Sequence, residues 1–280
     1  MLDSINYSYD VIIPNFNRTD TLLRAVRSVK KQSYPPSRIL ILDDGSNAIT
    51  KKFYEKHFME NSDVEIYEYS HHGNVGKLRL EGMRNSSAHF VAFLDSDDYW
   101  YPDKIQKQFE YLKKFSYLNV IAVSCNASHY ESLTTTEVTP LIKLKSSQII
   151  SFSKLLTENV IINSSVLLYR KKIEDFIKYP SVKWINAEDY CYWLMISLRY
   201  QIYFMEESFL FYENNSNDSV RKLNKVFLDD RIRVLVYLLY WTIKNSKNLQ
   251  SRLIIREILS QLSHDLYLAM TRLIRKIIYS

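Results

Sequence analysis

Short apolar runs alternate with helix-like segments along the first third of the chain. Runs of consecutive apolar residues are typical of buried strands, so the pattern predicts strands at Asp10–Pro14, Arg38–Asp43, Val64–Tyr69 and His89–Asp95. Between them, apolar residues recur every three to four positions, which predicts helices at Thr19–Gln32 and Lys77–Ser87. Strands that alternate with helices favour an α/β fold with a mostly parallel central sheet and helices on both faces.

The later part of the chain continues this alternation less regularly. It predicts a polar loop over residues 128–150, helices at Pro102–Phe115 and Asp189–Leu198, and strands at Val120–Asn126 and Ser165–Tyr169. From about Val220 the pattern is helical almost to the end, with an interruption at Asn245–Asn248. We therefore expect one main domain over residues 1–220, followed by a helical C-terminal segment over residues 221–280.

Charge is unevenly distributed along the 280 residues. The formal net charge is +6, but residues 221–280 alone carry +8, so the first 220 residues sum to −2. A basic C-terminal segment suggests a partner that carries negative charge. Cys125 and Cys191 have no CxxC partner, so we expect two buried thiols in a reducing compartment. No secretory signal precedes the first strand, and the apolar run Val234–Ile243 is too short for a membrane span, which predicts a cytoplasmic location.

Acidic residues cluster where predicted strands end and where a helix begins. Asp43-Asp44 follow the second strand, Asp95-Ser96-Asp97 follow the fourth, and Glu188-Asp189 open a later helix. Open α/β sheets bind ligands at the carboxyl ends of their strands, so these carboxylates can converge on one site. Two carboxylates two positions apart in a turn can hold a divalent cation and leave room for diphosphate oxygens. An acidic turn that merely caps the next helix has the same composition.

Four ordered segments resemble the inverting family 2 glycosyltransferases of the GT-A fold. They are VIIPNFNR at 11–18, LDDGS at 42–46, GNVGKLRLEGMRN at 73–85 and LDSDDYWYPDK at 94–104, and the resemblance returns at Ala187-Glu188-Asp189. It implies a Rossmann-like GT-A domain that transfers a sugar from a nucleotide-sugar, usually a uridine nucleotide, with Mn²⁺ or Mg²⁺. Residues 1–115 would bind this donor, and residues 116–220 would face the acceptor.

Carried over to this sequence, the resemblance implies a role for individual residues. Donor binding falls to Pro14, Asn15, Asn17, Arg18, Asp43, Asp44, Asn74, Gly76, Arg84, Asn85, Asp95 and Ser96. Asp95 and Asp97 form the family's DXD element and would be the metal ligands. Asp189, with Glu188 beside it, matches the catalytic base, a carboxylate that takes the proton of the acceptor hydroxyl. The alternative for Asp189 is a helix-start carboxylate favoured by the helix dipole.

Some segments depart from the family pattern. Many members close a loop with Arg or His over the diphosphate, whereas Tyr212–Val220 contains neither residue. The Gln-x-x-Arg-Trp signature of processive members is absent, which favours the addition of a single sugar. We expect His71 and His72 to be exposed loop residues. Tyr99–Tyr101 either stack on a sugar or pack in the core.

The last residues indicate a possible membrane partner. Residues 263–280 place Leu266, Met270, Leu273 and Ile277 on one helical face, which suits either an anionic membrane surface or packing against the main domain. Small bacterial family members imply an acceptor saccharide linked to polyprenyl diphosphate, in the synthesis of O-antigen, capsule or lipopolysaccharide. The protein would then lie peripherally on the inner face of the cell membrane.

Two other functions compete with the transferase hypothesis. A nucleotidyltransferase also uses acidic metal sites, but it usually has a Gly-rich phosphate loop, and PNFNRTD contains no glycine. A nucleic-acid-binding module could use the basic tail. The acidic site and the lack of a known nucleic-acid motif argue against a nucleic acid partner.

Overall fold

The computed structural model describes residues 7–130, 138–144, 146–173, 187–212, 227–245 and 249–278. Its strands are β1 (Tyr9–Asn15), β2 (Arg38–Asp43), β3 (Val64–Glu68), β4 (Phe90–Phe93), β5 (Tyr99–Trp100), β6 (Val120–Tyr130), β7 (Val138–Pro140), β8 (Gln148–Ile150), β9 (Leu167–Tyr169) and β10 (Gln201–Phe211). Its α-helices are α1 (Asp20–Lys30), α2 (Ala48–Phe58), α3 (Val75–Asn85), α4 (Lys104–Lys114), α5 (Phe152–Thr157), α6 (Glu188–Ser197), α7 (Phe227–Asn245) and α8 (Leu249–Ile278). Short 3₁₀ turns are η1 (Ser116–Leu118), η2 (Asn163–Ser165) and η3 (Arg170–Lys172).

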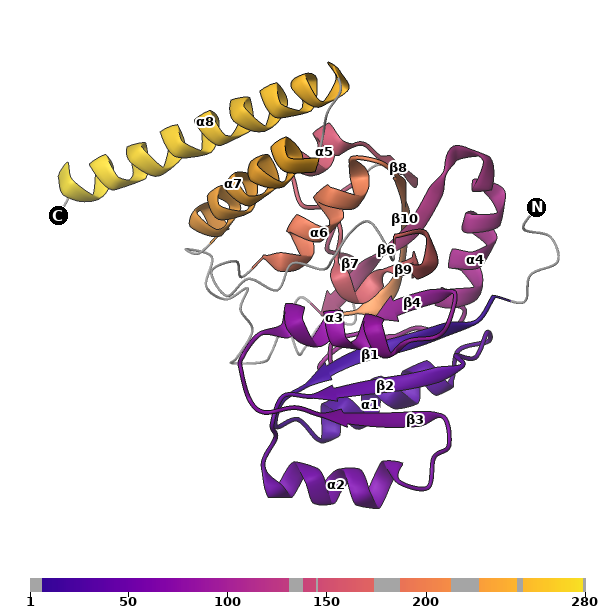
Figure 1. The fold of residues 1–280 in the computed structure, drawn as a ribbon. Coiled ribbons are helices and arrows are strands. Elements are labelled where there is room, and N and C mark those ends of the chain that lie inside the picture. The colour runs from indigo at the N-terminus through magenta and orange to yellow at the C-terminus, as the bar shows by residue number, and fades with distance from the viewer. Residues whose placement is uncertain are drawn as a thin grey trace.

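One sheet runs through the molecule in the order β3-β2-β1-β4-β9-β6-β10-β5, with β7 beside β6 and β8 beside β10 (Figure 1). The β3-β2-β1-β4 half is parallel throughout. The short strand β9 pairs antiparallel with both β4 and β6, and β10 returns parallel to β6. The predicted mostly parallel sheet is therefore correct for the main strands, while β9, β5, β7 and β8 run the other way.

Helices cover both faces of this sheet, as predicted. On one face α1, α2 and α4 pack on side chains such as Val11 and Ile13 of β1. On the other face α3 packs on Ile12 of β1, α6 packs on Phe93 of β4 through Trp193, and α5 and α7 pack against α6. Alternate residues of one strand point to opposite faces, and here both faces are covered by helices. A strand buried in this way needs apolar residues at consecutive positions, which is what the sequence of β1 provides.

Local sequence sets the start of the helices that lead away from the sheet. The side chains of Asn47 and Asn74 accept hydrogen bonds from backbone N–H groups of Thr50 and Lys77, which caps α2 and α3. The segment expected to be a polar loop over residues 128–150 instead contains the end of β6 and the short strands β7 and β8. Strand β10 and helix α2 were not predicted from the sequence.

The C-terminal helices α7 and α8 form a hairpin above α6 (Figure 1). Helix α7 ends at Asn245 and α8 begins at Leu249, which agrees with the predicted interruption at Asn245–Asn248. The expected domain boundary near residue 220 falls outside the described residues. None of the described helices combines the length and apolar character needed to cross a bilayer. Both thiols, Cys125 and Cys191, are buried and free, as expected.

Candidate active site

The site lies at the edge of the sheet where β1 and β2 end. Asn15 and Asp43 close these two strands in register, side by side, with Pro14 opposite Leu42 just before them. The amide of Asn15 donates to the Tyr54 hydroxyl at 2.7 Å and to the Arg18 carbonyl at 3.0 Å. These bonds fold the chain after β1 into a tight loop that brings Arg18 back over the strand ends.

Asn17 joins this first loop to the loop after β2. It adopts a left-handed backbone conformation with φ of 53°, which asparagine tolerates better than most residues. Its backbone N–H donates to the Ser46 hydroxyl at 2.8 Å, and its side-chain oxygen accepts from the Asn47 backbone at 2.8 Å. The predicted donor loop is thus held by both main-chain and side-chain bonds.

Asp43 and Asp44 are both buried, and each is bonded within the protein. Asp43 accepts the Tyr54 hydroxyl at 2.6 Å and the backbone N–H of Ser46 at 2.9 Å. Asp44 accepts the backbone N–H groups of His72 and Gly73 at 3.1 and 2.9 Å. Asp43 therefore shapes its own loop, and Asp44 ties that loop to the segment that leads into α3.

The two histidines of that segment behave differently. The His71 side chain is about half exposed and stacks on Phe16, with ring centroids 4.2 Å apart. The His72 side chain is largely buried, and its Nδ1 accepts from the backbone of Asn74 at 3.2 Å. The expectation of an exposed loop residue holds for His71 and is wrong for His72. Asn74 itself caps α3, and Gly76 is buried in the first turn of that helix.

The DXD turn follows β4 and is held from two sides. Arg18 forms an ion pair with Asp97 at 2.9 Å and donates to the Ser96 hydroxyl at 3.3 Å. On the other side, the backbone N–H of Asp95 donates to the hydroxyl of Ser164 in η2 at 3.1 Å. The indole of Trp100 donates to the Ser164 carbonyl at 2.8 Å and is buried. Of the two expected alternatives, stacking on a sugar or packing in the core, Trp100 therefore follows the second.

Arg79 connects the DXD turn to the acidic start of α6. Its guanidinium bonds one oxygen of Asp95 at 2.7 Å and one oxygen of Glu188 at 2.8 Å, although these partners lie far apart in the sequence. The Arg79 side chain is only 6% exposed, so little water screens these contacts. No role was predicted for Arg79. The available signal was its place one turn into α3, just after Asn74 and Gly76.

Glu188 and Asp189 occupy the first turn of α6. Burial, reinforced by the charge of Asp189, raises the pKa of Glu188 to about 7 even though Arg79 favours the charged form. Asp189 is partly exposed, and one of its oxygens accepts the backbone N–H of Tyr190 at 2.7 Å. The two neighbouring carboxylates therefore differ, because Glu188 is engaged by Arg79 whereas Asp189 makes a local helix-start bond.

The DXD carboxylates have an environment that suits a hard cation. Burial alone would raise the pKa of Asp95, but Arg79 outweighs it and the pKa is lowered. Burial and the charge of Asp95 raise the pKa of Asp97. Two carboxylates that repel each other fit the oxygen ligand set of Mg²⁺ or Mn²⁺. No cluster of three His, Cys, Asp or Glu groups suited to a metal occurs in the described part of the chain, so the remaining ligands would come from the diphosphate and water.

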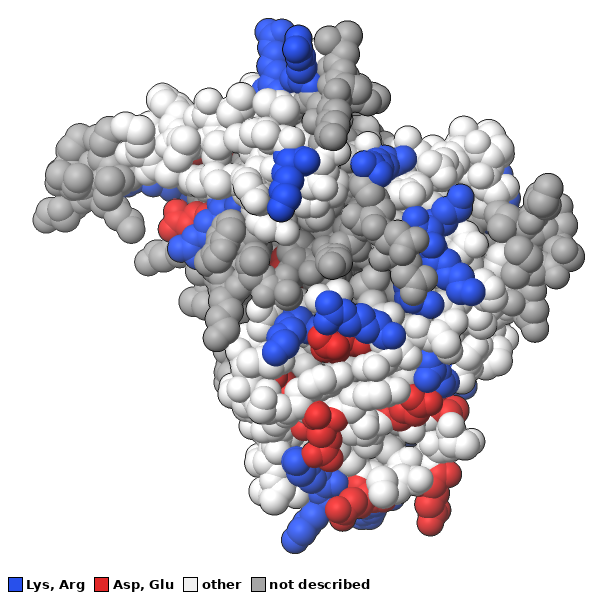
Figure 2. All heavy atoms as spheres, viewed as in Figure 1, with Lys and Arg blue, Asp and Glu red and all other residues white. Residues whose placement is uncertain are grey.

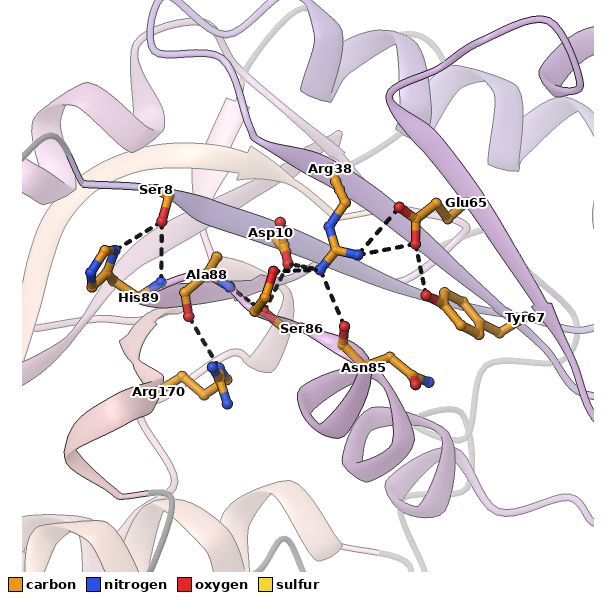
Figure 3. Close-up of polar contacts among 11 residues, drawn as sticks. Ser8, Asp10, Arg38, Glu65, Tyr67, Asn85, Ser86, Ala88, His89 and Arg170 are labelled. Carbon is orange, nitrogen blue, oxygen red and sulfur yellow. Dashed lines mark hydrogen bonds and ion pairs between the residues drawn. The ribbon is translucent and has the colours of Figure 1, made fainter.

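Arg84 and Asn85 do not reach this edge of the sheet. Helix α3 has 11 residues and spans about 16 Å, so its last turn lies at the opposite edge. There the Asn85 carbonyl accepts from Arg38, which also bonds Asp10 at the amino ends of β1 and β2 (Figure 3). Arg84 is more than half exposed and pairs with Glu81 at 2.7 Å. The arginine that the fold delivers to the site is Arg79.

The chain is similar to known glycosyltransferases. Residues 10–176 match the glycosyl transferase family 2 model. The Escherichia coli enzyme WfgD, named UDP-Glc:alpha-D-GlcNAc-diphosphoundecaprenol beta-1,3-glucosyltransferase, is 28% identical over 192 residues, which cover 68% of this chain and 70% of WfgD. Bacillus subtilis TuaG, a glycosyltransferase named for teichuronic acid biosynthesis, is 26% identical over 213 residues, covering 75% of this chain and 81% of TuaG.

Solved structures share the fold at lower identity. Staphylococcus aureus TarS 1-349 in complex with UDP-GlcNAc superposes with a TM-score of 0.68 at 16% identity, over 91% of this chain and 72% of TarS. The mannosyltransferase PcManGT from Pyrobaculum calidifontis, in complex with GDP-Man and Mn²⁺, gives a TM-score of 0.60 at 14% identity, over 96% of this chain and 76% of that chain. The expected GT-A fold is confirmed.

Proposed function

The chain belongs to glycosyl transferase family 2, and from this premise we propose that it moves a single sugar from a UDP-sugar to a hydroxyl of a saccharide carried on a polyprenyl diphosphate. The names of its E. coli relatives specify a UDP-sugar donor and a diphosphoundecaprenol acceptor. Such a transfer would build the repeating unit of a bacterial surface polysaccharide such as O-antigen or capsule. Membership of this family favours the transferase over the nucleotidyltransferase and nucleic-acid hypotheses.

The observation that carries the proposal is the chain of ion pairs across the site. Arg18 connects the first donor loop to Asp97, and Arg79 connects Asp95 to Glu188. Residues from β1, α3, β4 and α6 are thereby brought to one edge of the sheet. Acidic and basic groups alternate there. This arrangement suits a metal-bound diphosphate, for which carboxylates bind the metal and cations lie near the phosphates, beside a carboxylate that accepts a proton.

Donor and metal binding would be divided among three loops. The loop after β1, with Asn15, Asn17 and Arg18, and the loop after β2, with Asp44, would surround the nucleotide. Asp95 and Asp97 would hold Mn²⁺ or Mg²⁺ as part of the DXD turn. A bound cation would neutralise the charge that develops on the departing diphosphate. Arg18 already supplies positive charge beside Asp97 and would remain close to the phosphates.

Asp189 is the residue we assign to proton removal. The acceptor oxygen forms its bond to the anomeric carbon while the bond from that carbon to the diphosphate breaks, and the hydroxyl proton passes to a carboxylate. Direct displacement inverts the configuration at that carbon. Glu188 is held by Arg79 at 2.8 Å, which leaves Asp189 as the freer base of the pair. Glu188 and Arg79 would then position the start of α6 relative to the DXD turn.

Calorimetric titration with UDP, in Mn²⁺, in Mg²⁺ and in EDTA, tests the proposal. We expect binding that requires the metal and that Asp97→Asn removes, because this substitution removes a charged ligand. Asp189→Asn is the matched control, since it should bind UDP normally yet lose sugar transfer by at least about a hundredfold. UDP binding that is unaffected by both EDTA and Asp97→Asn would contradict the assignment of the DXD turn.

The location of the protein follows from the proposed acceptor. A polyprenyl-linked saccharide stays in the membrane, so the active site has to work at the membrane surface. A UDP-sugar donor drawn from the cytoplasm would put the reaction at the inner face. We therefore propose a peripheral membrane protein.

A further inference from the structure

Exposed apolar side chains are concentrated on the C-terminal hairpin. Eight of the fourteen large apolar residues that are exposed in the described part of the chain lie on it: Val236, Tyr240 and Ile243 of α7, and Leu253, Leu259, Leu266, Tyr267 and Met270 of α8. Leu253, Tyr267 and Met270 are each more than 60% exposed. We call these eight residues the hairpin patch. Exposed apolar side chains that are concentrated in one part of a globular protein often mark a contact site.

The hairpin patch is not an unfinished part of the core, because the opposite faces of the same helices are already packed. Val234, Leu235 and Leu238 of α7 and Ile258 of α8 are completely buried in the main core. Arg231 forms an ion pair with the buried Asp265 at 2.7 Å and donates to backbone carbonyls at the end of α5 at 2.8 and 2.9 Å. The hairpin is thus fixed to the main domain while the patch faces outward.

The charged residues around the patch are mainly basic. Arg233 and Lys244 are exposed on α7, and Arg252, Arg256 and Arg272 are exposed on α8, whereas Asp229 is the one exposed acidic residue among those described on the hairpin. Lys244 also lies over the ring of Tyr240 at 5.9 Å. In the view of Figure 2, isolated basic groups lie on a mostly uncharged upper region, and most acidic groups lie lower, around β2, β3 and α2.

We propose that the hairpin patch binds an anionic lipid surface, with its apolar side chains inserted at the headgroup level and exposed cations such as Lys244, Arg252 and Arg256 contacting lipid phosphates. Apolar residues flanked by Lys and Arg are typical of helices that lie in the membrane interface. This proposal rests on the proposed function in one respect, since a polyprenyl-linked acceptor gives the protein a reason to be there. It also changes the sequence prediction, because the surface spans α7 and α8 instead of residues 263–280 alone.

The position of the hairpin suits this role. Strands β1, β2 and β3 end on the side of the molecule toward which the C-terminal end of α8 projects (Figure 1). The candidate active site lies at those strand ends. A membrane that contacts the outer face of α8 would lie on the other side of the hairpin from the sheet (Figure 1), so it would leave the strand ends uncovered.

The test is co-sedimentation of the full chain with vesicles of phosphatidylglycerol and phosphatidylcholine, compared with vesicles of phosphatidylcholine alone. The apolar variant carries Leu253→Ser, Tyr267→Ser and Met270→Ser, and the charge variant carries Arg252→Gln and Arg256→Gln. Matched controls on α2 and just beyond it remove similarly exposed groups, through Ile49→Ser with Met59→Ser and through Lys52→Gln with Lys56→Gln.

We expect the wild-type chain to prefer the anionic vesicles. The apolar variant should bind at least about tenfold less, and the charge variant about thirtyfold less, because each cation near a charged membrane contributes about a factor of five. Both controls should bind like the wild type. Titration with UDP in the same variants separates the two proposals, since the donor site is remote from the hairpin and should be unaffected.

Two outcomes would overturn the proposal. One is vesicle binding that is equal in the wild type, the apolar variant and the charge variant. The other is a stable dimer in light scattering that the apolar variant dissociates, which would assign the patch to a second copy of the chain. If the wild type did not bind UDP at all, this would count against the proposed function and would leave the membrane proposal intact.

Discussion

Arg79 lies between the carboxylates of Asp95 and Glu188 with its side chain almost fully buried. A buried cation with two anionic partners is retained only when its hydrogen bonds are well made, because each charge has lost its water. Here one guanidinium bridges the turn after β4 and the first turn of α6. Its position therefore determines how far the DXD turn lies from the start of α6.

Substitution of Arg79 tests this role. Arg79→Gln leaves two buried carboxylates without their cation, and we expect it to lower the free energy of unfolding by about 3–5 kcal/mol and to abolish transfer. The measurement is urea unfolding together with an assay of sugar transfer. Arg84→Gln, at the other end of the same helix, is the control and should change stability by less than about 0.5 kcal/mol. Equal effects of the two substitutions would contradict the assignment of Arg79.

Glu188 makes a prediction about pH. Its pKa is raised to about 7 in the folded protein, whereas an exposed glutamate in the unfolded chain titrates near about 4.3. Between these values the folded state keeps a proton that the unfolded state has lost, so stability falls as pH rises. From about pH 4 to about pH 8, the wild type should lose up to about 3 kcal/mol relative to Glu188→Gln. Urea unfolding across this range measures it, and parallel profiles of the two proteins would refute it.

Site residues could be predicted from the sequence where they directly follow a predicted strand. Asp43 and Asp95 follow apolar runs that predict buried strands, so their meeting at one edge follows from parallel pairing. Asn15 was assigned through the family resemblance. Arg79 could not be separated from Arg84 in this way. Both lie in the same segment that resembles the family, and only the start and direction of α3 show which one reaches the site.

At the scale of elements, helix α3 illustrates how close packing fixes the site. A Cβ atom added at Gly82 would lie 2.6 Å from Cγ2 and 3.0 Å from Cγ1 of Ile12, which is buried in β1. The missing side chain therefore lets α3 approach the sheet closely. This contact holds the helix that carries Arg79 and Asn74 in place.

Gly82→Ala should destabilise the protein despite the better helix propensity of alanine. Overpacking against β1 costs about 1–3 kcal/mol, while the gain in propensity is at most about 1 kcal/mol. Thermal or urea unfolding measures the difference. Lys77→Ala, at an exposed position of the same helix, serves as the control and should be nearly neutral. A more stable Gly82→Ala variant would show that α3 can move away from β1 without cost.

Elements were predictable where their own sequence determined them and not where a distant partner did. Strands β1, β2 and β4 were found because they are buried on both faces. Strand β10 was missed, since its Glu206-Glu207 pair interrupts the apolar run and a register shift follows there. The direction of β9 also depends on β4 and β6, which no local pattern shows.

At the scale of the whole molecule, the two ends of the chain carry the two proposed binding surfaces, one for the donor and one for the membrane. The N-terminal strands and their loops form the candidate donor site, and the C-terminal hairpin carries the patch assigned to the membrane. Helix α6 joins them, because it begins with Glu188 beside Arg79 and packs along α7. Through this packing, the hairpin would hold the proposed catalytic carboxylates at a fixed height above the lipid surface.

The place of β9 also has a consequence for biosynthesis. In space β9 lies between β4 and β6, but in the sequence it follows β6, and residues 94–166 separate it from the end of β4. A chain leaving the ribosome therefore completes the β3-β2-β1-β4 half of the sheet with β4 as an unpaired edge, and such edges recruit strands from other chains. This edge stays open until the three-residue strand β9 has been synthesised and pairs with β4. The expected division near residue 115 would then separate donor binding from acceptor binding, but a chain that ended there would still have β4 as an unpaired edge.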